Sequence, residues 1–133
     1  MARYINHNVN PQKNHVGDCT VRAIAKVLGQ DWHTTFWQLC AFGDINCDMP
    51  SSNAVWGQYL RSMGFRRNVV DDHERDIYTV ADFCNDNPKG AYVLALSSHV
   101  VAVVDGRYYD TWDSGNEIPI YYWEKKEAKE GEA

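Results

Sequence analysis

The stretch that decides the fold is SHVVAVVDGRYYDTWD, residues 98–113. The residues from Val100 to Val104 are all apolar, which is typical of a buried strand. Asp105-Gly106 follows them, and this dipeptide is preferred in two-residue type I′ turns. We therefore expect a β-hairpin in which a strand from His99 to Val104 returns as a strand from Arg107 to Trp112.

The register of this hairpin brings a histidine and a carboxylate together. Counting outward from a two-residue turn, His99 faces Trp112, and Asp110 lies on the same sheet face as His99, one diagonal step nearer the turn. Asp113 has the opposite parity and faces His99 only if the turn contains a bulge. A lone histidine at the start of a strand is most often structural, but an acidic neighbour on the same face favours a functional pair.

Outside the hairpin, the hydrophobic pattern changes from helical to strand-like at about Gly90. Residues 4–16 have the composition of a loop. The expected helices are 18–29, 33–42, 52–63 and 79–85, and the expected strands are 91–96, 99–104, 107–112 and 118–123. Helices first and an antiparallel meander afterwards predict an α+β domain with the helices packed on the sheet, not a βαβ fold.

The length and composition are those of one globular domain. A chain of 133 residues leaves room for a single core, and 44% hydrophobic residues suffice to fill it. We assign residues 1–123 to this domain and expect the charge-dense residues 124–133 to form a disordered tail. The aromatic residues at helical spacing are expected in the core: Phe36, Trp37, Trp56 and Tyr59.

The charge pattern and the apolar runs exclude two kinds of partner. The net charge is −5, and no long Lys/Arg block is present, so nucleic acid is not an expected partner. The apolar runs are too short to cross a bilayer, and the N-terminus has no apolar targeting segment. We expect a cytoplasmic protein, or one in the host cytoplasm if a virus encodes it. The sequence carries no signal of oligomeric state.

The four cysteines are irregularly spaced and are expected to be reduced thiols. Cys19 differs from the others because it is the first residue of the helix expected after Asp18. There, unpaired backbone N–H groups and the helix dipole lower a thiol pKa and favour the thiolate. Cys40 and Cys84 lie in apolar patterns that indicate packing, and Cys47 lies in a loop with no assigned role.

No metal or other cofactor is expected. His7, His15 and a cysteine do not have the spacing of a zinc site. The acidic run at residues 71–76, which contains His73, lacks the ligand spacing of a calcium loop and is expected to be a solvated loop.

The order of these parts resembles that of the papain-like cysteine peptidases. The likeness is closest to their compact bacterial and bacteriophage members and to the bacteriocin-leader-processing peptidases. Three motifs carry it: GDCTVRAIA at 17–25, SHVVAVVDG at 98–106 and YDTWD at 109–113. The resemblance implies a papain-like fold in which the nucleophile begins the first long helix and the helices pack on a C-terminal antiparallel sheet.

The resemblance also implies a chemistry. Cys19 and His99 would form a thiolate–imidazolium pair oriented by Asp110, with Asp113 as the alternative third member. The pair would attack a peptide or isopeptide carbonyl of a peptide or protein substrate and form an acyl-enzyme. Trp112 matches the family's tryptophan, which shields the hydrogen bond of the histidine from water, and this favours Asp110. Unlike the other aromatic residues, Trp112 is also expected to line the substrate pocket. Arg22, one turn into the helix, is expected to make a structural ion pair.

One position departs from the family's pattern. The family holds the oxyanion with the backbone N–H of the nucleophile and a glutamine six residues before it, but that position is Lys13 here. Gln12 or Asn14 is expected to replace it, with His15 as a further donor. The same triad also serves acyltransferases and deamidases, and a non-catalytic interaction module of viral or bacterial origin keeps the same fold. These two functions are the alternatives to hydrolysis.

Overall fold

The computed structural model describes residues 3–70 and 77–125 of the chain. This part forms a mixed α+β domain. Its helices are α1 (Cys19–Leu28), α2 (Trp32–Asn46), α3 (Asn53–Ser62) and α4 (Val80–Asp86). Its strands are β1 (Tyr4–Asn6), β2 (Phe65–Val69), β3 (Ala91–Ala95), β4 (Val100–Val104), β5 (Arg107–Asp110) and β6 (Tyr121–Lys125).

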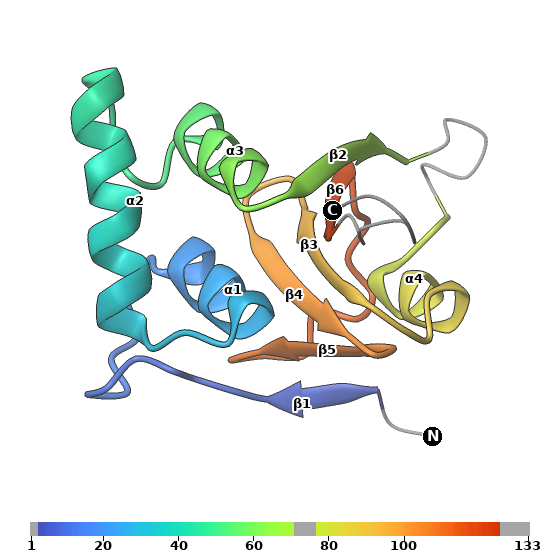
Figure 1. Ribbon diagram of the computed structural model, residues 1–133. Coiled ribbons are helices and arrows are strands. Elements are labelled where there is room, and N and C mark those ends of the chain that lie inside the picture. The colour runs from blue at the N-terminus through green and yellow to red at the C-terminus, as the bar shows by residue number, and fades with distance from the viewer. Residues whose placement is uncertain (1–2, 71–76, 126–133) are drawn as a thin grey trace, which may run out of the picture.

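The described strands form one six-stranded sheet in the order β1-β5-β4-β3-β6-β2 (Figure 1). Its centre is the predicted meander of β3, β4 and β5, in which each strand pairs antiparallel with the next. Val104 pairs with Arg107, as a two-residue turn requires. The turn residues Asp105 and Gly106 have φ of 50° and 77°, the two positive values of a type I′ turn. The hairpin prediction is therefore confirmed.

The predicted meander is wrong at its last strand. β6 does not follow β5 in the sheet but pairs antiparallel with β3. The reason is that the free edge of β5 is occupied by β1, which pairs with it in parallel in a segment expected to be a loop. The Ile120 N–H, just before β6, donates to the Ala95 carbonyl at 2.8 Å, and this bond starts the new pairing.

The sheet also extends beyond the segments expected from the sequence. β2, which the hydrophobic pattern does not predict, pairs with β6 along its whole length. β6 contains Glu124 and Lys125, so the domain continues past the boundary expected at Trp123. The rest of the expected tail lies outside the described residues.

The two faces of the sheet are covered by different helices. Val93, Ala95 and Val100 pack with residues of α1, α2 and α3 in one core. The alternate strand residues, such as Leu94 and Val101, pack with α4 in a second core. In Figure 1, α1, α2 and α3 lie together over β3 and β4, and α4 lies apart from them. The N-terminus of α1 is thus held against the start of β4.

One aromatic residue departs from the predicted core. Trp56 and Tyr59 of α3 are buried, and Phe36 packs against the same core. Trp37, however, is 67% exposed. Helix α2 buries Thr35 and Leu39, and Trp37 is two residues from each, which places it on the opposite side because each residue turns a helix by about 100°.

Helix α2 also runs further than expected. The sequence predicts a helix over 33–42 that ends at Gly43, but α2 continues to Asn46. Gly43 is buried against the following loop, where an added Cβ would lie 2.6 Å from the Asp48 carbonyl oxygen. The glycine therefore permits a close approach of the loop, and the helix ends at Cys47, whose φ of 53° is left-handed.

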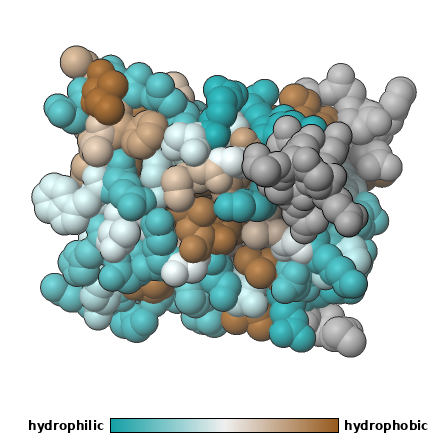
Figure 2. All heavy atoms as spheres, viewed as in Figure 1, coloured by the Kyte–Doolittle hydropathy of each residue, from teal (hydrophilic) through white to brown (hydrophobic). Residues whose placement is uncertain are grey.

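The surface on the side of α1, α2 and α3 is mostly hydrophilic, with hydrophobic residues gathered near its centre (Figure 2). Within residues 3–70 and 77–125, no helix combines the length and the apolar character needed to cross a membrane.

Candidate active site

Cys19 is the first residue of α1, as expected, but the helix cap differs from the expected one. Asp18 makes no side-chain hydrogen bond to the backbone of the first turn. Its carboxylate turns to Arg22 instead, whose Nε donates to Asp18 Oδ1 at 2.8 Å. The first backbone N–H groups of the helix are therefore left for another acceptor, and they lie beside the Cys19 thiol.

His99 immediately precedes β4, and Asp110 ends β5. The His99 Nε2 and Asp110 Oδ2 atoms lie 2.6 Å apart. The Cys19 thiol lines the same two pockets as this imidazole, and each group shifts the pKa of the other. Because Nε2 is engaged with Asp110, Nδ1 is the ring nitrogen left for the thiol. The structure thus brings Cys19, His99 and Asp110 together in a row.

Asp113, the alternative partner of His99, is turned elsewhere. Its Oδ1 accepts hydrogen bonds from the Tyr108 hydroxyl and from the backbone N–H of Gly115. His99 is therefore oriented by Asp110 and not by Asp113.

Asp110 is 1% exposed, and donors surround both of its carboxylate oxygens. Oδ1 accepts from Arg22 Nη1 at 3.2 Å and from the Thr111 N–H at 2.8 Å. Oδ2 accepts from Ser114 Oγ at 2.8 Å in addition to its contact with His99. Burial alone would raise the pKa of Asp110, but the bonds from His99 and Ser114 outweigh it and lower this pKa. Asp110 is therefore a fixed negative charge.

Arg22 joins Asp110 to the start of the nucleophile helix. Its guanidinium contacts Asp18 through Nε and Asp110 through Nη1. Asp18 accepts two further bonds, from Trp32 Nε1 at 3.0 Å and from Asn10 Nδ2 at 3.2 Å. The expected structural ion pair of Arg22 is present, and the structure shows that it joins two carboxylates, Asp18 and Asp110.

The pKa values of Cys19 and His99 are both shifted, each in the direction that favours the charged form of that side chain. For Cys19, burial opposes ionisation, but the hydrogen bond and charge of His99, the Val100 N–H and the charge of Arg22 lower the thiol pKa. For His99, burial favours the neutral ring, but bonds from Asp110 and Cys19 raise the pKa of the imidazole to about 9. Both shifts therefore favour the charged pair, a Cys19 thiolate beside a His99 imidazolium.

Two pockets open on either side of Cys19 and His99. One, of about 290 Å³, includes Asn14, His15 and Trp112 in its lining. The other, of about 230 Å³, includes Ser51, Asn53 and Ser97. Both reacting side chains line both pockets, so a chain lying across the site would pass directly over the thiol.

The pocket linings distinguish between the expected oxyanion donors. Asn14 and His15 line the first pocket with Cys19, whereas Gln12 does not. Gln12 lies beyond Lys13, whose φ of 56° turns the chain away, and its N–H is bonded to Asn10 Oδ1. Of Gln12 and Asn14, the residues expected to replace the family's glutamine, Asn14 is therefore the better placed, and His15 lies in the same pocket.

Trp112 lies over His99, with ring centroids 5.0 Å apart. It is 45% exposed and lines the pocket next to the catalytic pair. Its indole covers the imidazole on the solvent side, as the sequence predicted for a shielding residue.

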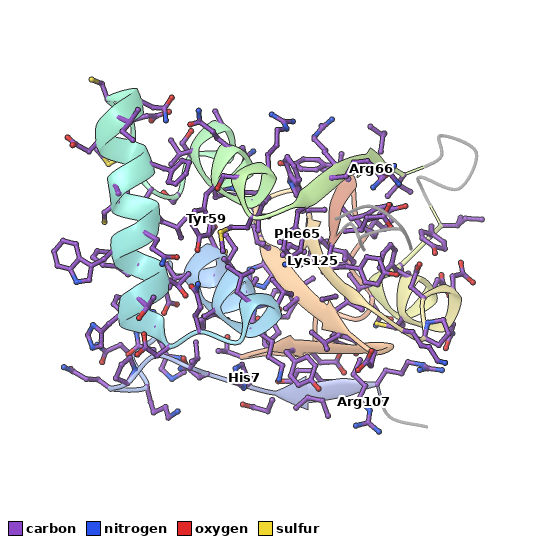
Figure 3. The ribbon with its side chains drawn as sticks, viewed as in Figure 1. His7, Tyr59, Phe65, Arg66, Arg107 and Lys125 are labelled. Carbon is purple, nitrogen blue, oxygen red and sulfur yellow. The ribbon has the colours of Figure 1, made fainter. Side chains whose placement is uncertain are left out.

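The remaining histidines and cysteines that the structure describes are placed differently. The backbone N–H of His7, which is labelled in Figure 3, donates to the backbone carbonyl of Asp110. The pKa of the His7 ring is lowered, mainly by burial and next by the charge of Lys26. Cys84 is buried, and burial raises its thiol pKa to about 11. Cys40 is partly buried and Cys47 is exposed. His73 and the acidic run at 71–76 lie outside the described residues.

No group of three His, Cys, Asp or Glu side chains suited to a metal ion is found within residues 3–70 and 77–125. No protein-family model matches the chain, and neither a curated protein nor a solved structure matches it significantly.

Proposed function

We propose that this protein is a thiol-dependent hydrolase, a cysteine peptidase or isopeptidase of papain-like type, with Cys19, His99 and Asp110 as its triad. One observation carries the proposal: the His99 imidazole lies between the Cys19 thiol, with which it lines two pockets and whose pKa it lowers, and the buried Asp110 carboxylate, 2.6 Å from Nε2. This is the arrangement that activates a thiol nucleophile.

In the first half of the reaction, the Cys19 thiolate attacks the substrate carbonyl carbon and a C–S bond forms. The oxyanion that develops is held by the Cys19 backbone N–H and the Asn14 side-chain amide. The His99 imidazolium then gives its Nδ1 proton to the leaving amine as the C–N bond breaks. An acyl-enzyme and neutral His99 remain.

In the second half, His99 takes a proton from a water molecule, and the resulting hydroxide attacks the acyl carbon. The C–S bond breaks, the carboxylic acid leaves, and the thiolate and imidazolium are restored. Asp110 fixes the ring orientation throughout, and Trp112 keeps bulk water from the Asp110–His99 bond. Because the thiol must stay reduced, a reducing compartment such as the cytoplasm suits this chemistry.

The test is digestion of a proteome-derived peptide library, read by mass spectrometry, with and without an added primary amine. We expect new peptide termini from the parent protein and none from Cys19→Ala. Hydrolysis gives free carboxyl termini even with the amine present, whereas an acyltransferase gives mostly amine adducts. If parent and Cys19→Ala leave the library equally unchanged, the hydrolase proposal is wrong and a binding module remains.

A further inference from the structure

A further pocket adjoins the candidate active site. It has a volume of about 360 Å³ and lies between α3 and the β6–β2 edge of the sheet. Asn53, the first residue of α3, lines both this pocket and the one beside Cys19 and His99. The two pockets are therefore neighbours, with Asn53 at the end of α3 between them.

The walls of this pocket carry two cations that have no anionic partner within residues 3–70 and 77–125. Arg67 of β2 lies over the Tyr121 ring, 4.2 Å from its centroid, and Arg61 of α3 lies over the Trp123 ring at 5.3 Å. Within residues 3–70 and 77–125, no carboxylate pairs with either guanidinium. Rings hold both side chains in place while their N–H donors stay exposed, which suits them to bind an anion from solution.

A third donor in the same pocket is also unsatisfied. The indole Nε1 of Trp123 is buried, and among the described residues it has no hydrogen-bond acceptor. Buried donors normally have a partner. Among the described residues, the pocket therefore combines two cations without a carboxylate partner and two aromatic rings, with an unsatisfied indole N–H buried in its wall, in a protein whose net charge is −5.

The neighbouring Arg66 does not line the pocket, and it has a carboxylate partner. It alternates with Arg67 along β2 and so points to the opposite face of the sheet. Its Nη2 lies 2.7 Å from the Glu124 carboxylate, at the β2–β6 edge where Figure 3 labels it. Arg66 therefore serves as a matched control for Arg67.

The sheet register gives the span from the thiol to this pocket. Val100 pairs with Ala95, Ala95 with Tyr121, and Tyr121 with Val69. These are three steps between strands of about 4.8 Å each, or about 14 Å across the sheet to Val69, and Arg67 lies two residues further along β2, which makes the distance to it about 16 Å. An extended peptide advances about 3.3 Å per residue. About four or five substrate residues would cover the span.

We propose that this pocket, bounded by Arg61, Arg67, Tyr121 and Trp123, is a substrate subsite for a carboxylate. It receives an acidic group that lies four or five residues from the scissile bond of the peptide. This group always lies on the same side of the scissile bond along the substrate chain. The inference rests on the proposed hydrolase function and adds the substrate class, an acidic peptide.

The test uses the same peptide library with the parent, the double variant Arg61→Gln/Arg67→Gln and the control Arg66→Gln. Among the bonds cleaved by the parent, we expect Asp or Glu to be enriched about fivefold to tenfold at one position four or five residues away. The double variant loses the enrichment, and Arg66→Gln keeps it.

Synthetic copies of one cleaved peptide identify the source of the carboxylate. One carries Glu at that position, one carries Gln, and one ends there with Gln and a free α-carboxylate. The parent is expected to cleave the Glu peptide with a KM about fivefold to tenfold lower than the Gln peptide at equal kcat. If the truncated peptide is cleaved as well as the Glu peptide, the subsite binds a chain terminus. If it is cleaved only as poorly as the Gln peptide, the subsite binds an acidic side chain.

The possible failures differ from one another. Cys19-dependent cleavage without acidic enrichment, or enrichment that survives Arg61→Gln/Arg67→Gln, overturns the subsite and leaves the hydrolase standing. Absence of any Cys19-dependent cleavage overturns the hydrolase, and the substrate subsite with it.

Discussion

Replacing His99 by alanine is expected to slow Cys19-dependent turnover by about 10⁴-fold or more. The substitution removes the proton donor to the leaving amine and the hydrogen bond that lowers the Cys19 pKa. Asp110 keeps its bonds from Arg22, Thr111 and Ser114, so the fold should persist. The measurement is the cleavage rate of a peptide taken from the library, with circular dichroism to check folding.

Asp110→Asn is the matched comparison for this variant. Its amide oxygen still accepts a hydrogen bond from His99 Nε2, but the charge is gone. Burial lowers the His99 pKa, and without the opposing Asp110 charge that pKa falls below about 9. Turnover needs the protonated ring, so the alkaline decline near pH 9 moves to lower pH, with a smaller loss of rate than in His99→Ala. A folded His99→Ala protein that keeps more than a tenth of the parent rate would contradict the proposed mechanism.

Arg22→Leu is expected to lower the free energy of unfolding by about 3–5 kcal/mol. The guanidinium bridges Asp18 and Asp110, which are 7% and 1% exposed. Removing it leaves two buried carboxylates without their shared cation, at the point where α1 meets β5. Urea unfolding followed by circular dichroism measures the change.

Two other substitutions test whether this loss of stability comes from the bridge that Arg22 makes between Asp18 and Asp110. Arg22→Lys keeps the charge, but one ammonium cannot reproduce the planar fork that reaches both carboxylates, so we expect an intermediate loss. Arg66→Gln breaks an exposed ion pair and should cost about 1 kcal/mol or less. A loss below about 1 kcal/mol for Arg22→Leu would show that the Asp18–Arg22–Asp110 network does not hold the site together.

The parts of the fold that local sequence encodes were predicted well. The end of α1 at Gly29 and the turn at Asp105-Gly106 depend on positive φ, which short motifs report. The hairpin register then placed Asp110 beside His99 without any knowledge of the rest of the chain.

The parts that depend on distant segments were not predicted. The pairing of β1 with β5 joins residues about a hundred positions apart and leaves no periodic signal in Tyr4–Asn6. Once β1 occupies that edge, β6 must pair elsewhere, which the hairpin alone does not reveal. The contact of Arg22 with Asp110 is likewise a consequence of helix packing on the sheet. The carboxylate subsite combines α3, β2 and β6, and no motif links these segments.

The most direct test of the central claim, that Cys19 is an activated nucleophile, is its alkylation at pH 6. Iodoacetamide labelling followed by peptide mapping reports all four cysteines in one experiment. An ordinary thiol is about 0.3% thiolate at this pH, so a thiolate paired with His99 should react about 30- to 100-fold faster. We expect Cys19 to be labelled at least 30-fold faster than the exposed Cys47, and His99→Ala to remove this preference. Equal labelling of Cys19 and Cys47 in the parent protein would contradict the account.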